Sequence, residues 1–281
     1  MARLPGITIT GYNVQSVVDD KHKLIIASDV TNAGNDLHQL HRMAKMAKEM
    51  LDADELEALA DAGFHDSKEL AKCENDDITT FVPEPKKISK AEKDGRFTRD
   101  SFNDDIERNV YKCPSGEELV RQGRPFERNG KIHRRFASKT ICCKGCPLRD
   151  KCLSKTAKTR LIYRSEYEDV VERQRVRMRE SKGKMRERAG LVEHPFGTLK
   201  HRAGWTHFLV RGFEKVGGEW ALMVTSYNFT RVLNIIGFEA FRDYCLQRRD
   251  KREKSVISHR LCRFIPVILP FLSHLKIITD F

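Results

Sequence analysis

The chain has 281 residues, of which 40% are hydrophobic and 33% are charged. This composition excludes a disordered chain, and the length allows one large domain or two modest ones with a buried core. The net charge of +12 favours polyanionic partners over neutral ones.

The charge is distributed unevenly along the chain. Residues 1–85 carry 8 Lys and Arg against 16 Asp and Glu, whereas the remainder carries 44 against 24. An acidic part beside a basic part suits a protein that gathers carboxylates at a metal site and basic groups along phosphates. A well-solvated surface with uneven charge is the alternative interpretation.

The N-terminus, Met1–Pro5, lacks the apolar core of a signal peptide. The longest apolar stretch, Phe264–Leu275, contains two prolines and is too short to cross a bilayer. We therefore expect a cytoplasmic protein without a membrane partner. In that compartment eight cysteines indicate metal ligands or buried thiols rather than disulfides.

The first third of the chain predicts strands and helices in alternation. Short strands are predicted at Tyr12–Val18 and Leu24–Ala27. Apolar residues at three-to-four spacing then predict a helix from His38 towards Ala60, although Leu56–Ala60 also suits a short buried strand that ends at Asp61. A helix with Ser67 as its N-cap (Ser67–Glu74) and a brief strand (Ile78–Val82) follow.

The rest of the chain changes character. Residues 86–160 are rich in Lys, Asp, Arg and Gly and hold most of the cysteines, which is typical of an inserted subdomain. A basic helix is predicted over Glu166–Arg188, and a second helix over Glu214–Ile236. The core face of the second helix is predicted to hold Trp220, Met223, Val224, Tyr227, Val232, Leu233 and Ile236.

Two segments carry residues suited to chemistry. Leu59–Ser67 delivers Asp61 at the end of a predicted strand, where its carboxylate suits a hard cation, and Gly63 relaxes the backbone two residues later. Leu191–Lys200 places Glu193 after the basic helix. The alternatives are an ordinary turn residue for Asp61 and a solvated carboxylate for Glu193.

Six motifs in one order give the chain a recognisable resemblance. They are Gly11-Tyr12-Asn13-Val14-Gln15, Val18-Asp19, Val30-Thr31-Asn32 with Gly34-Asn35-Asp36, Ala60-Asp61-Ala62-Gly63-Phe64, Cys143-x2-Cys146-Pro147 and Val192-Glu193-His194-Pro195-Phe196-Gly197. Together they resemble the DDE transposases of bacterial insertion sequences. The resemblance covers about Gly11 to Gly237.

The resemblance implies a fold and a mechanism. The fold would be α/β, with a ribonuclease-H-like mixed sheet flanked by helices. Three carboxylates would hold two Mg²⁺ or Mn²⁺ ions, about 3.5–4 Å apart, for phosphodiester hydrolysis and strand transfer on insertion-sequence ends. Asp61 would be the second carboxylate and Glu193 the third. Lys200 would contact DNA near the cleaved bond, and Arg173, Arg177, Lys184 and Arg188 would follow the phosphates.

One departure from the family pattern is expected to matter. The family's first Asp lies on the opening strand, upstream of Gly11, and Met1–Thr10 contains no carboxylate. We therefore expect an N-terminally truncated transposase, incomplete at its first strand and close to inactive. The alternatives are a non-catalytic DNA-binding remnant and a zinc-knuckle interaction protein. The sequence leaves a homodimer open.

The predicted organisation has four parts. The first part of the catalytic core spans 1–85, the Cys-rich insertion 86–160, the basic helices with Glu193 161–240, and a basic and apolar tail 241–281. In the insertion, Cys113, Cys143, Cys146 and Cys152 include a C-x2-C pair and suit a structural Zn²⁺ site. Cys142 competes for a place, and four buried or free thiols are the alternative.

Overall fold

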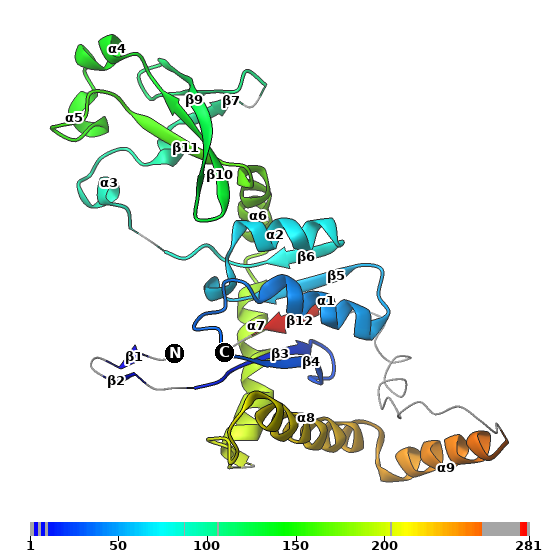
Figure 1. The fold of residues 1–281 in the computed structure, drawn as a ribbon. Coiled ribbons are helices and arrows are strands. Elements are labelled where there is room, and N and C mark those ends of the chain that lie inside the picture. The colour runs from blue at the N-terminus through cyan, green and yellow to red at the C-terminus, as the bar shows by residue number, and fades with distance from the viewer. Residues whose placement is uncertain are drawn as a thin grey trace. The chain divides into compact units, whose positions relative to one another are not determined.

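The computed structural model describes residues 3–4, 7–8, 11–86, 88–105, 107–202, 204–254 and 276–279. The chain divides into two compact units, residues 1–84 with 173–281, and residues 85–172 (Figure 1). Both units combine sheet and helices, so the mixed α/β class is confirmed.

The first unit is built on a mixed sheet with the strand order β4-β3-β12-β5-β6. Its strands are β3 (Asn13–Asp19), β4 (Ile25–Thr31), β5 (Leu56–Ala60), β6 (Ile78–Phe81) and β12 (Lys276–Thr279), and a short ribbon of β1 (Arg3–Leu4) and β2 (Ile7–Thr8) precedes them. Its helices are α1 (Leu40–Leu51), η1 (Ala62–Phe64), α2 (Ser67–Asn75), α7 (Lys184–Gly197), η3 (Thr198–Arg202), α8 (Phe213–Ile236) and α9 (Phe238–Lys254); α6 (Glu168–Glu180) runs across the boundary between the units.

The segment Leu56–Ala60 is a strand, and the predicted helix ends earlier, at Leu51. Asp52 adopts the left-handed conformation and closes that helix. Leu-Glu-Ala-Leu-Ala has a helix-favouring composition, but β5 pairs in parallel with both β12 and β6 and is almost wholly buried. Tertiary pairing therefore overrides local propensity at the strand that leads to Asp61.

Two other helix boundaries also differ from the prediction. Asp66, rather than Ser67, caps α2, because its side chain accepts the backbone N–H groups of Lys68 and Glu69. The basic stretch is split into α6 and α7 by a turn at residues 181–183, which contains Gly183.

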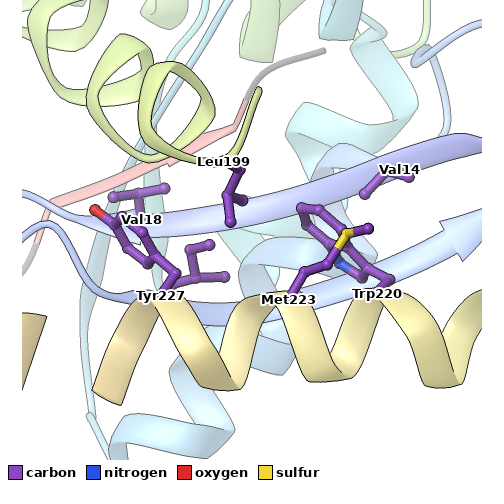
Figure 2. Packing of buried hydrophobic residues seen from close by; sticks show 7 residues of the cluster. Val14, Val18, Leu199, Trp220, Met223 and Tyr227 are labelled. Atoms are coloured by element: carbon purple, nitrogen blue, oxygen red, sulfur yellow. The ribbon is translucent and has the colours of Figure 1, made fainter. Parts of the chain in front are cut away.

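Helices cover both faces of this sheet. In Figure 1, α1 lies in front of the strands and α7 behind them. On α7, Leu191 packs against Leu59 and Phe81. On α8, Trp220, Met223 and Tyr227 pack against Val14, Val18 and Leu199 (Figure 2). Trp220, Met223 and Tyr227 confirm part of the predicted core face, whereas Val232, Leu233 and Ile236 are only partly buried.

The second unit holds an antiparallel sheet with the order β11-β10-β9-β8-β7. Its elements are α3 (Lys90–Lys93), η2 (Arg99–Ser101), β7 (Asn103–Asp105), β8 (Val110–Lys112), β9 (Glu118–Arg128), β10 (Lys131–Ala137), α4 (Thr140–Lys144), α5 (Arg149–Cys152) and β11 (Leu161–Ser165). Its small core consists of Phe102, Tyr111, Leu119, Phe136 and Ile162.

The central strand of the first sheet comes from the far end of the chain. β12 runs antiparallel to β3, with Ile278 opposite Val18, and parallel to β5, with Ile278 opposite Leu59. It lies between these two strands in the sheet. The predicted apolar tail residues Phe264–Leu272 lie outside the described residues.

Replacing a β12 residue with proline tests this strand order. Ile278→Pro removes a backbone donor from a central strand and leaves a buried acceptor without a partner, so we expect the free energy of unfolding to fall by about 1–3 kcal/mol. Ile278→Val keeps the donor and the β-branched shape and is the matched control. Urea unfolding followed by circular dichroism compares the two. Equal midpoints for both variants would show that β12 is not part of the sheet.

Candidate functional site

Asp61 follows β5 directly, and local hydrogen bonding sets its position. Its side chain caps η1 by accepting the backbone N–H of Gly63 at 2.7 Å. A Cβ on residue 63 would lie 2.9 Å from Asp61 Oδ1, closer than real Cβ contacts occur. A side chain at residue 63 would therefore displace the Asp61 carboxylate from its present position, and Gly63 does not have the positive φ that favours glycine. The Asp61 side chain remains 38% exposed.

Arg188 links Asp61 to α7. Arg188 is 8% exposed, and its Nη2 lies 3.8 Å from Asp61 Oδ2. Leu191, one turn further along α7, packs against Leu59 of β5. The helix that carries Glu193 is thus packed against the strand that ends at Asp61.

Asp36 is a second carboxylate beside this position. Its Oδ2 would lie 3.8 Å from a Cβ on Gly63, so it approaches the same space as Asp61. Asn13 and Gln15 each donate a side-chain hydrogen bond to Asp36 Oδ1, at 2.8 and 2.6 Å. Asn13 and Gln15 are two residues apart on β3 and so share one face of the strand. The sequence singled out their motif but did not predict this function for it.

Glu193 lies on α7 with an exposed side chain. In the described ranges, no three His, Cys, Asp or Glu side chains gather closely enough to hold a metal ion. The structure therefore packs the helix that carries Glu193 against the strand that precedes Asp61. Among the described residues, it does not bring the two carboxylates into a common group of metal ligands.

The predicted DNA-contacting residues of α6 and α7 have acidic partners within the first unit. Arg173 and Arg177 pair with Glu74 of α2, at 2.6 and 3.2 Å. Lys184 pairs with Glu57 of β5 at 2.5 Å and lies over the ring of Phe81. Together with the Arg188 pair, these contacts attach the basic helices to the acidic N-terminal part. Contact of these side chains with DNA stays a prediction.

Lys200 has a different setting. It lies in η3, a π-helical turn that continues α7 beyond Pro195, and its side chain is exposed. Its ammonium lies 5.8 Å from the centre of the Phe196 ring.

A polar face of α8 holds the β3–β4 hairpin in place. Asn228 donates to the carbonyl of Ile25 and accepts its N–H, so one side chain pairs with strand backbone. The Tyr227 hydroxyl donates to the carbonyl of Lys23, and Arg231 donates to that of His22. His194, beside Glu193, contacts the Tyr227 hydroxyl at 2.9 Å. The helical pattern predicted only the apolar face of α8, because polar side chains on a helix carry no periodic signal.

The second unit presents a basic hairpin that sequence reasoning missed. β9 and β10 are joined by Asn129-Gly130, both with positive φ, which is the turn that suits the twist of a two-residue hairpin. Residues 121–135 contain six Lys and Arg against one Glu, and most of them are exposed. Two features of the sequence could have predicted this hairpin: the excess of Lys and Arg over residues 121–135, and the turn-forming pair Asn129-Gly130.

Aromatic rings lie among these basic residues on one face of the sheet. Phe126 stacks on His133 and meets Tyr163 edge to face, with ring centroids 5.8 Å apart in both pairs. The strand register and the two-residue alternation put Arg128, Lys131 and Arg135 on this same face. Phe136 and Ile162 point the other way, into the core. We call the face of Phe126, Arg128, Lys131, His133, Arg135 and Tyr163 the outer face.

Comparison with known proteins identifies one segment. Residues 112–233 match the family described as "Transposase DDE domain". The match includes Glu193, Lys200 and the four cysteines considered for zinc, while Asp61 lies outside it. No curated protein matches the chain. No solved structure matches it either. No helix in the described ranges has both the length and the apolar character needed to cross a bilayer.

The motif residue Asp19 has a structural position at the β3–β4 turn. Its carboxylate is buried and accepts the backbone N–H groups of His22 and Leu24, at 2.6 and 2.5 Å. Burial raises the pKa of Asp19 above its ordinary value of 3.8, although these two hydrogen bonds act in the opposite direction. The folded state therefore holds the proton more tightly than the unfolded chain does.

This raised pKa predicts a pH dependence of stability. The contribution of the Asp19 carboxyl is fully present below pH 3.8 and is lost as the pH rises through the folded pKa. We expect the free energy of unfolding of the wild type, relative to Asp19→Asn, to fall across that window. Urea titrations of both proteins at several pH values measure the difference. A difference that stays constant or increases with pH would contradict this assignment.

Proposed function

We propose that this protein acts in DNA transposition, by metal-dependent hydrolysis and transfer of phosphodiester bonds at insertion-sequence ends. The observation that carries the proposal is the match of residues 112–233 to the transposase DDE domain. The packing of α7 against β5 supports it, because this packing connects the matched segment to Asp61. The strand order around β12 and the helices on both sheet faces support a ribonuclease-H-like core.

The oxygen donors at this site suit Mg²⁺ or Mn²⁺. Hard divalent cations prefer carboxylates, and Asp61 and Asp36 approach the same space. Asp61 and Glu193 would be ligands, and Asp36 is a candidate beside them. When bound, the cation would stabilise negative charge on the attacking and leaving oxygens of a phosphodiester. Asn13 and Gln15 would keep Asp36 oriented, and Arg188 would offset the charge of Asp61.

A non-catalytic DNA-binding protein is the second candidate. The ion pair between Arg188 and Asp61 favours it, because a bound cation would have to compete with the guanidinium. Both candidates bind DNA, so DNA binding does not distinguish them. Cleavage of DNA does, because only the first candidate is catalytic.

Nicking of supercoiled plasmid in Mg²⁺ or Mn²⁺ tests the catalytic proposal. The sequence predicted a chain close to inactive, but β12 lies between β3 and β5 in the sheet, so we expect wild-type protein to nick the plasmid. We expect Asp61→Asn to reduce the rate to that of a reaction with chelator. Asp29→Asn is the control, because Asp29, on β4, is a partly exposed carboxylate that pairs with Arg42 of α1. Metal-dependent nicking that persists in Asp61→Asn would reject the catalytic assignment of Asp61. DNA binding without any nicking would favour the non-catalytic candidate.

We propose two regions that contact DNA. One is the outer face of the second unit, and the other is Lys200 of the first unit. Arginine and lysine neutralise phosphates, and exposed aromatic rings stack on unpaired bases. Arg128, Lys131 and Arg135 provide the charge, while Phe126 and Tyr163 are 37% and 42% exposed. This combination of cations and partly exposed rings suits nucleic acid better than an acidic protein.

The salt dependence of DNA binding distinguishes the outer face from the basic helices. We expect Arg128→Ala with Arg135→Ala to weaken binding and to reduce the slope of log K against log salt by about 1 for each phosphate that is no longer neutralised. Arg173→Ala tests α6 in the same way, and we expect a smaller change in slope because its guanidinium pairs with Glu74. Fluorescence anisotropy at several salt concentrations measures both. A slope that falls in Arg173→Ala but stays unchanged in the double variant would assign phosphate binding to α6.

A further inference from the structure

Five cysteines from two distant segments line one cavity in the second unit, and four of them are candidate metal ligands. Cys113 lies in the tight turn between β8 and β9, where its N–H donates to the carbonyl of Glu117. Cys143, Cys146 and Cys152 lie on or beside α4 and α5, between β10 and β11. All four face the same cavity. The fold thus brings together a thiol and a C-x2-C pair that are about thirty residues apart in the sequence.

The segment that carries three of these cysteines is held by side-chain hydrogen bonds, including those of Arg149 to the carbonyls of Cys143 and Ala157, but it has little apolar core of its own. α4 and α5 contain five and four residues, too few to be stable as isolated helices. Residues 139–160 are all described, and Leu153 is the only buried hydrophobic residue among them. Ile141 is 77% exposed. A bound metal stabilises such core-poor segments.

Cys142 lines the same cavity. Cys143 is the better ligand candidate, because Cys143 and not Cys142 forms the C-x2-C spacing with Cys146. The described cysteines form no disulfides. Within the described part of the chain, no three potential ligands are already at coordinating distance. Metal binding would therefore draw the sulfurs inward, to about 2.3 Å from the metal.

We propose that Cys113, Cys143, Cys146 and Cys152 form a closed, structural Zn²⁺ site that anchors the segment between β10 and β11. Four thiolates leave no open position on a tetrahedral ion, so the zinc would have no catalytic role. The proposal does not depend on the function proposed for Asp61, because the two sites lie in different units.

Metal analysis and cobalt substitution of the full-length protein test the site. We expect one zinc per chain, and a Co²⁺-substituted protein with the intense visible absorption of tetrahedral thiolate coordination. Cys113→Ser and Cys146→Ser should lose both signals. Cys142→Ser and Cys245→Ser, the latter on an exposed cysteine of α9, should keep both. A wild-type protein supplied with zinc that still binds none would overturn the proposal, as would full zinc binding by Cys113→Ser. Loss of zinc in Cys142→Ser, with retention in Cys143→Ser, would overturn the ligand assignment.

Alkylation of the wild-type protein tests the same site without any variant that must fold. We expect the four ligand cysteines to resist a maleimide until a chelator removes the metal, and then to react. Cys73 provides an internal control for folding, because burial raises its pKa to about 12 and should keep it protected in both states. Cys245 should react in both. Equal reactivity of the four cysteines with and without chelator, while Cys73 stays protected, would contradict zinc binding.

Discussion

The candidate site depends on the ion pair between Arg188 and Asp61. An arginine that is 8% exposed needs negative charge nearby, and breaking a buried ion pair by removing one partner typically costs about 3–5 kcal/mol. Asp61 is less buried than Arg188, so the cost here should be smaller. The pair joins α7 to the end of β5, and it sets the charge that a cation would encounter. Any effect of Asp61 on metal chemistry therefore includes its interaction with Arg188.

Similar ion pairs extend along α6 and α7. Arg173 and Arg177 pair with Glu74, Arg175 pairs with Glu84, and Lys184 pairs with Glu57. Each partly exposed pair contributes little, about 0–1 kcal/mol. Together these ion pairs give one reason for the uneven charge. Acidic side chains of the N-terminal part bind basic side chains of α6 and α7 and hold these helices against the first unit. The excess positive charge in the second unit is concentrated instead on the exposed β9–β10 hairpin.

The sequence predicted those elements whose side chains repeat with a clear period. The strand that begins near Tyr12, the helix that carries Trp220, Met223 and Tyr227, and the strand alternative for Leu56–Ala60 are all confirmed. The central strand β12 could not be predicted, because its pairing joins residues more than two hundred positions apart and no local pattern encodes such pairing.

The candidate site could be predicted only in part, for the same reason. Asp61 was predictable because it ends a short apolar strand, and Glu193 because it lies in a recognisable motif. The support of Asp36 by Asn13 and Gln15 depends on a contact between a strand and a distant loop. The ion pair of Asp61 with Arg188 likewise joins segments that are distant in the sequence.

The central claim is that Asp61, with the helix that carries Glu193, forms a site for a divalent cation. Binding of Mn²⁺ measured by the electron paramagnetic resonance signal of the free ion tests it most directly, because no DNA or turnover is needed. The account predicts that wild-type protein removes Mn²⁺ from solution and that Asp61→Asn and Glu193→Gln each weaken this binding. Mn²⁺ binding that both substitutions leave unchanged would contradict the account.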